Sequence, residues 1–159
     1  MAALDRIDYQ IVGLLRNNAR LSNKEIAAKV GLAPSTCLVR TRMLQQSGVI
    51  TGFKAELNPL ALGVGLQAMI AVRLKRHYKP DVEAFRLHAL ELPEVVRLYH
   101  VAGPIDFLAH VWAKDPEHLR DLAMTAFTAR EEVSHIETEL IFEHVSCREL
   151  PSFLKELQE

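Results

Sequence analysis

Cysteine is scarce in this sequence: only Cys37 and Cys147 occur among the 159 residues, and they lie far apart in different segments. This scarcity excludes a disulfide framework and indicates two reduced thiols in a cytoplasmic protein. The chain also lacks an apolar run long enough to cross a bilayer, and its first residues lack the basic stretch and apolar core of a signal peptide. We therefore expect a cytoplasmic protein with no membrane contact.

Groupings of catalytic or metal-binding residues are missing as well. All seven histidines lie within residues 59–159, but no pair has the spacing of metal ligands on one helix. No nucleophile stands in a pattern with a general base. The sequence therefore predicts no metal, no cofactor and no catalytic residues.

Charge is distributed unevenly, although the net charge is only −1. Residues 1–58 hold eight Lys and Arg against four Asp and Glu, a balance of +4. Residues 59–159 hold eleven against sixteen, a balance of −5. A basic front and an acidic back predict two domains, of which the first faces a polyanion.

Residues 22–48 predict two short helices joined by a tight turn. Ser22 stands three residues before Glu25, which is the spacing of an N-terminal capping box. Gly31 fits the left-handed position at the end of the first helix, and Pro34 fits the first position of the second. Two such helices form a helix-turn-helix, whose second helix commonly lies in the major groove of DNA.

The second of these helices is predicted to run to Gly48. Leu38, Thr41 and Leu44 have the spacing of residues that face a helical core. Ala33, which precedes the helix, offers no side-chain cap, and this absence is expected to cost roughly 1 kcal/mol.

Two further elements complete the first domain. A helix is predicted over residues 4–18, where Asp5 can serve as the N-cap. Apolar and charged residues alternate over residues 53–57, which predicts a strand with two unlike faces. A strand after a helix-turn-helix is a wing, so the first domain is predicted to be a winged helix-turn-helix.

The second half alternates between strand and helix patterns. Strands are predicted over residues 66–74, 95–101, 107–113 and 135–142, and helices begin at Pro80 and Pro116. The order βαββαβ is the split ferredoxin-like arrangement, in which both helices cover one face of an antiparallel sheet. Because the first strand carries Met69 and Ala71 on its second face, we expect a partner chain to cover that face.

These patterns define an α+β protein with two domains. We expect the winged helix-turn-helix over residues 1–58, a linker over residues 59–65, and the ferredoxin-like domain over residues 66–159. The turn at Asn58-Pro59 and the glycines at 63 and 65 mark the boundary.

Five segments, in this order along the chain, resemble one family. They are Leu-Asp-Arg-Ile-Asp from residue 4, Leu-Ser-Asn-Lys-Glu-Ile-Ala from 21, Ser-Thr-Cys-Leu-Val-Arg-Thr-Arg-Met-Leu from 35, Ser-Gly-Val-Ile-Thr-Gly from 47 and Gly-Pro-Ile-Asp-Phe from 103. Together they are similar to the Lrp/AsnC, or feast/famine, transcription regulators, over nearly the whole chain. The resemblance implies a ligand-binding domain of the RAM type, an amino-acid effector, and homodimers that assemble to octamers.

Polar and basic residues of the helix-turn-helix are the candidate contacts to double-stranded DNA. Arginine side chains on the second helix can bind a guanine edge or a phosphate. Hydroxyl groups near its start can reach bases or phosphates. The candidates are Ser22, Asn23, Lys24, Ser35, Thr36, Val39, Arg40, Arg42 and Lys54.

A second candidate site is the turn from Gly103 to Asp106. Glycine allows close backbone approach, free amides there can hold a carboxylate, and Asp106 can pair with an ammonium group. These features fit an α-amino acid, although a plain hairpin is an alternative from the residues alone. The family resemblance implies amino-acid binding at this loop, between neighbouring dimers. The candidates are Tyr99, His100, Val101, Ala102, Gly103, Pro104 and Asp106, with Thr138 from a neighbouring subunit.

Two alternative functions stay open at this point. Certain haem-pathway decarboxylases resemble the family in fold, so an enzyme is one alternative. The other is an architectural DNA-binding protein that responds to no effector.

Overall fold

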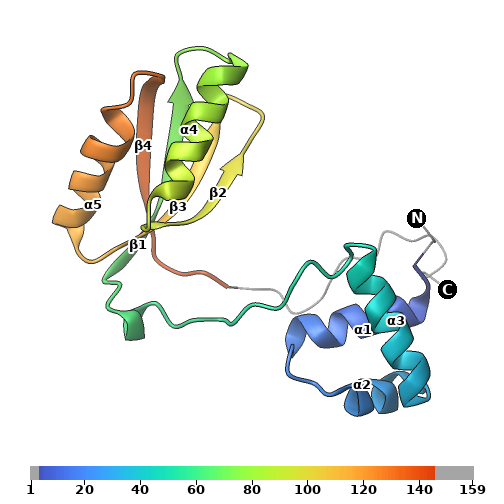
Figure 1. Cartoon of the computed structure of the whole chain (residues 1–159). Coiled ribbons are helices and arrows are strands. Elements are labelled where there is room, and N and C mark those ends of the chain that lie inside the picture. Colours follow the sequence, from blue (N-terminus) through green and yellow to red (C-terminus); the bar gives the residue numbers. More distant parts are fainter. Residues whose placement is uncertain (1–3, 146–159) are drawn as a thin grey trace. The chain divides into compact units, whose positions relative to one another are not determined.

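The computed structural model describes residues 4–145, which form two compact units (Figure 1). The first contains residues 4–56 and the second residues 57–144, so the division falls two residues before the predicted end of the first domain. No helix in the described part of the chain is long and apolar enough to span a membrane.

Three helices make up the first unit: α1 (Arg6–Asn17), α2 (Asn23–Val30) and α3 (Pro34–Gln46). The predicted cap of α2 is confirmed, since Ser22 and Glu25 form a capping box and Gly31 ends the helix with a φ of 71°. Asp5 and Asp8 form a second capping box at the start of α1. The three helices bury one small core, made by Ile11, Leu15, Ile26, Ala27, Val30, Cys37 and Leu44.

Two local predictions in this unit are wrong. Leu38 is 38% exposed, and Cys37 occupies the core position instead, because the buried side of α3 runs through Cys37 and Leu44. The predicted wing strand over residues 53–57 is not formed. A strand needs a neighbouring strand for its backbone hydrogen bonds, and no strand within residues 4–145 pairs with this segment.

The second unit confirms the βαββαβ order. Its elements are β1 (Leu66–Leu74), α4 (Lys79–Glu91), β2 (Val95–His100), β3 (Phe107–Ala113), α5 (Pro116–Leu122) and β4 (Val133–Ile141). A short 3₁₀ turn (Leu60–Leu62) precedes β1, and a π-helical segment (Ala123–Thr128) continues α5. The sheet is antiparallel in the order β2-β3-β1-β4, and α4 and α5 cover one of its faces (Figure 1).

The core of this unit lies between the sheet and the two helices. Alternate residues of β1 and β3 face it, so the buried residues of both strands recur at every second position, apart from Ala71 of β1. Three fully buried phenylalanines meet there: the ring of Phe85 lies 4.9 Å from that of Phe107 and 6.1 Å from that of Phe127, measured between centroids. Among the described residues, no helix packs on the opposite sheet face.

The phenylalanine cluster makes a first testable prediction. Phe85→Ala should lower the free energy of unfolding by about 3–5 kcal/mol, because it removes a buried ring and leaves a cavity. Urea unfolding followed by the fluorescence of Trp112, the one tryptophan of the chain, measures this unit. Leu90→Ala on the same helix is the control, since Leu90 is 57% exposed and should change the value by less than about 0.5 kcal/mol. Equal costs for the two variants would contradict this core assignment.

Candidate DNA and effector sites

The outward side of α3 carries most of the predicted DNA contacts. Ser35, Thr36, Val39 and Arg42 are all exposed and lie away from the side that Cys37 and Leu44 bury. Two residues that the sequence analysis did not select share this side. Met43, 56% exposed, follows Val39 by four residues, and Gln46 follows it by seven, so helical spacing alone was sufficient to find them.

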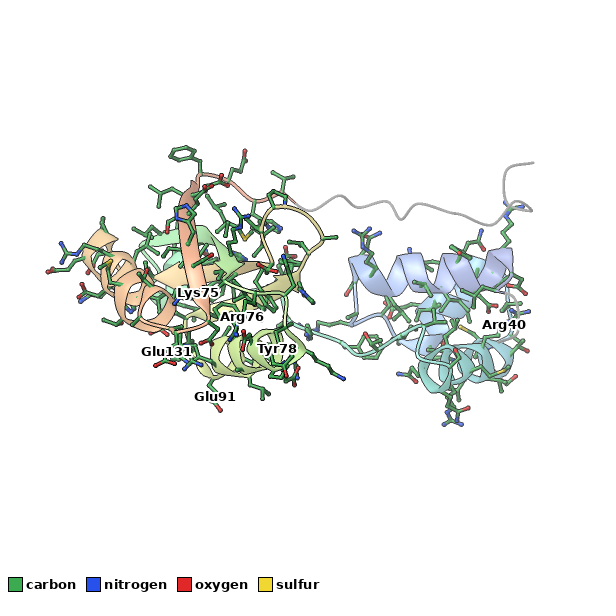
Figure 2. All side chains as sticks on the ribbon, turned by 90° about the horizontal axis from the view of Figure 1, so that it is seen from above. Arg40, Lys75, Arg76, Tyr78, Glu91 and Glu131 are labelled. Carbon is green, nitrogen blue, oxygen red and sulfur yellow. The ribbon has the colours of Figure 1, made fainter. Side chains whose placement is uncertain are left out.

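Arg40 occupies a different position from Arg42. Its Nη1 atom lies 2.7 Å from Asp5 Oδ2 and 2.9 Å from Asp8 Oδ1, so it ties α3 to the start of α1 (Figure 2). These hydrogen bonds raise the pKa of the Arg40 guanidinium. The pKa of Asp5 is lowered, first because the amide of Asp8 donates to its carboxylate and then because Arg40 does. Because Nη1 is committed to two carboxylates, the placement argues against the predicted base contact of Arg40.

Of the remaining DNA candidates, two form hydrogen bonds within the helical unit and two are exposed. Ser22 is engaged in the cap of α2, where its hydroxyl group lies 2.7 Å from Glu25 Oε2. Asn23 donates from Nδ2 to the carbonyl of Pro34 at 2.6 Å and thereby braces the turn between α2 and α3. Lys24 and Lys54 are exposed and can contact phosphates.

Ala33 and Thr41, at the start and in the middle of α3, lie where the sequence placed them. Ala33 makes no side-chain cap, as predicted, and Pro34 occupies the first turn. Thr41 is half-buried and satisfies its hydroxyl group by donating to the carbonyl of Cys37 at 2.9 Å. A polar residue is tolerated at this inward position because its hydrogen bond stays within the helix.

The predicted effector loop presents unpaired backbone donors. Gly103 adopts a φ of 143°, a conformation that favours glycine. Within the described part of the chain, the amides of Ala102, Gly103 and Ile105 have no hydrogen-bond partner. Neighbouring free amides of this kind are suited to hold a carboxylate.

Asp106 does not have the predicted role in this conformation. Its side chain is only 2% exposed, and it is the single buried charged residue among residues 4–145. Oδ2 accepts a hydrogen bond from the Leu74 amide at 2.8 Å, and Oδ1 lies 2.6 Å from His77 Nδ1. Because both oxygens already have partners and face away from solvent, the carboxylate is not free to bind the ammonium group of a ligand.

The other effector candidates do not converge within one subunit. Tyr99 and His100 are successive residues of β2 and point to opposite faces of the sheet; His100 stacks on Phe107 with centroids 4.7 Å apart. Val101, Ala102 and Pro104 lie in the loop itself. Thr138 lies on edge strand β4, with β1 between it and β3, so it is remote from the loop of its own subunit.

No group of three His, Cys, Asp or Glu side chains within the described residues is placed to hold an ion. The two features that stand out are a helix-turn-helix with an exposed recognition face and a sheet domain with a loop of free amides. Together they define a DNA-binding regulator with a separate ligand-binding domain.

Comparison with known proteins gives the same two domains. Residues 4–51 match the family described as winged helix-turn-helix DNA-binding, and residues 67–151 match the Lrp/AsnC ligand binding domain. The chain belongs to the Lrp/AsnC family of transcriptional regulators.

Relatives and solved structures of this family are similar over most of their length. The HTH-type transcriptional regulator AldR of Mycolicibacterium smegmatis is 43% identical over 142 residues, which cover 89% of this chain and 83% of that protein. The leucine-responsive regulatory protein of Rhizobium meliloti is 35% identical over 142 residues, covering 89% and 91%. A transcriptional regulator from Neisseria meningitidis, solved in complex with L-Met, has a TM-score of 0.84 at 28% identity, covering 91% of this chain and 94% of the other.

The ion pairs of Arg40 lead to a second prediction. Arg40→Ala should lower the stability of the helical unit by about 1 kcal/mol near neutral pH, since half-exposed ion pairs contribute on that order. The pKa of Asp5 is lower in the folded than in the unfolded chain. The stability that its ionised carboxylate contributes is therefore fully present above the ordinary Asp pKa of about 3.9, and it is lost as the pH falls through the folded pKa. The difference between the unmodified chain and Arg40→Ala should therefore shrink as the pH falls below about 3.9.

Urea titrations followed by the amide signals of α1 in NMR spectra measure this difference at each pH. Arg42→Ala is the matched control and should leave the stability unchanged, because no ion pair of Arg42 occurs among the described residues. A difference that did not vary with pH would exclude the carboxylates as the partners that matter.

Proposed function

We propose that this regulator reads its operator through the outward side of α3 and that an amino acid binds the loop at residues 102–105. The observation that carries the first part is the division between the two arginines of α3: Arg40 is held by carboxylates, whereas Arg42 is exposed. Arg42 is then the side chain that can form a bidentate contact with guanine. Val39 and Met43 can make apolar contacts beside it, and Lys24 and Lys54 can neutralise phosphates.

The amino-acid effector is supported by the chemistry of the loop. Three free amides around Gly103 can donate hydrogen bonds to the α-carboxylate of a ligand. The similar Neisseria meningitidis regulator was solved with L-Met, which makes an amino acid the first class to test. Both carboxylate oxygens of Asp106 already have partners, so another residue must bind the ammonium group of the ligand. We propose that this residue, like Thr138, comes from a neighbouring subunit.

We also propose that the uncovered face of the sheet is closed by a second copy of the chain. One row across that face runs Arg97, His110, Met69 and Glu139, from edge strand β2 to edge strand β4. A two-fold axis through its middle would place Arg97 of each copy over Glu139 of the other, with the half-buried Met69 and Trp112 near the centre. Two recognition helices would then address half-sites about one helical turn apart. Assembly of such dimers to an octamer belongs to this proposal.

Regulation in the cytoplasm, without catalysis, is the role that we propose for the chain. Its family consists of transcriptional regulators. An effector-independent architectural protein is the alternative that the experiments below separate, since such a protein has no operator preference and no stabilising ligand.

The DNA proposal is tested by Arg42→Ala, with an operator selected from random duplexes by the unmodified protein. Its affinity for the operator should fall about tenfold or more, while affinity for unrelated DNA falls much less, because one base contact contributes roughly 1–3 kcal/mol of discrimination. Gel-shift titrations on both DNAs measure this. Lys54→Ala should weaken both DNAs alike and make the salt dependence shallower, as expected for a phosphate contact. Equal, small effects of the two variants on both DNAs would refute the assignment of Arg42.

The effector proposal is tested by thermal unfolding in the presence of each of the twenty amino acids. A ligand at about 100 times its dissociation constant should stabilise the folded chain by about 2.7 kcal/mol and raise its melting temperature by several degrees. The amide derivative of the same amino acid should have no effect, because it lacks the carboxylate. Gly103→Ala should abolish the shift, whereas Gly52→Ala should not, because Gly103 has a positive φ and Gly52 does not. No shift with any amino acid would overturn the proposal.

A further inference from the structure

His77 lies beside the effector loop and takes no part in the functions assigned so far. It belongs to the segment that joins β1 to α4, together with Lys75, Arg76 and Tyr78 (Figure 2). Its side chain is 77% exposed, yet Nδ1 lies 2.6 Å from the Oδ1 atom of Asp106, which is only 2% exposed. An exposed residue thus reaches the single buried carboxylate of the described chain.

The Asp106 residue connects three segments through four interactions. Its side chain accepts from the Leu74 amide at 2.8 Å and pairs with His77. Its backbone amide donates to the carbonyl of Val72, and its carbonyl accepts from the Val101 amide, both at 2.9 Å. The two ends of the loop, the end of β1 and the approach to α4 are therefore held at one residue.

We infer that His77 is a positioning residue for the effector site, an inference that rests on the proposed amino-acid binding at residues 102–105. Nδ1 carries a hydrogen and donates it to Asp106 Oδ1, since a carboxylate can only accept. Without this donor the buried oxygen has no partner, and the cost of leaving it unpaired favours conformations in which Asp106 turns towards water. Such a movement releases the Val101 end of the loop and separates the amides that would hold a carboxylate.

The test compares three variants of the full chain. His77→Ala removes the donor. His77→Asn keeps it, because the amide nitrogen of asparagine lies about where Nδ1 lies in histidine. Arg76→Ala is the matched control: Arg76 is the preceding residue and also forms an ion pair, but with Asp81 at 3.3 Å and not with Asp106.

Amide hydrogen exchange tests the positioning without any ligand. In His77→Ala, the amides of Leu74 and Val101 should exchange about tenfold faster or more, in line with the loss of a hydrogen bond to a charged group. The amides of Ile70 and Val111, in the middle of the sheet, should keep their rates, which separates local release from global destabilisation. His77→Asn and Arg76→Ala should both match the unmodified chain. Exchange in His77→Ala that is no faster than in Arg76→Ala would overturn the inference.

Titration with the twenty amino acids, followed by thermal unfolding, tests the consequence for binding. For any amino acid that stabilises the unmodified chain, the midpoint concentration should rise about tenfold in His77→Ala and return in His77→Asn. An unchanged midpoint in His77→Ala would also overturn the inference, while leaving the proposed effector intact. If no amino acid stabilises the unmodified chain, the proposed effector fails, and hydrogen exchange alone decides whether His77 holds the loop.

Discussion

A carboxylate that leaves water must find hydrogen-bond donors, and Asp106 imposes this constraint on the second unit. The donors come from Leu74 at the end of β1 and from His77 just beyond it. These hydrogen bonds hold the loop before β3 against the end of β1 and against the segment that leads to α4. The free amides around Gly103 lie in the loop that Asp106 holds at its end. The loop that carries the candidate effector site is thus held at one buried charge.

The helical unit separates stability from recognition on a single helix. The inward side of α3 supplies Cys37 and Leu44 to a small core, and Arg40 extends from its flank to two carboxylates at the start of α1. The outward side keeps Arg42 and Met43 exposed. Two arginines only two residues apart have different environments because successive helical positions point about 100° apart. Residue type alone therefore did not distinguish the arginine that pairs with carboxylates from the arginine that is exposed.

Sequence reasoning was most successful where structure depends on nearby residues. The caps at Asp5 and Ser22 and the alternation in β1 and β3 all follow from spacing within a few residues, and the structure confirms them. It failed at residues 53–57, where the alternating pattern was correct for a strand but the chain provides no neighbouring strand. The prediction that Leu38 faces the core failed for another reason: a shift of one position along a helix exchanges a buried residue for an exposed one.

By itself, the sequence determined the two kinds of domain, the order of their elements and the family, because periodicity, caps and local motifs are written in neighbouring residues. Only the tertiary structure decided the roles of individual charges. Arg40 meets Asp5 and Asp8 across more than thirty residues, and His77 meets Asp106 across a similar interval. Such pairs form only where the packing of helices and strands brings the two residues together. Residue type alone does not identify the pair, because each charged residue could pair with many others. A charge therefore acquires its function from the partner that the fold places beside it.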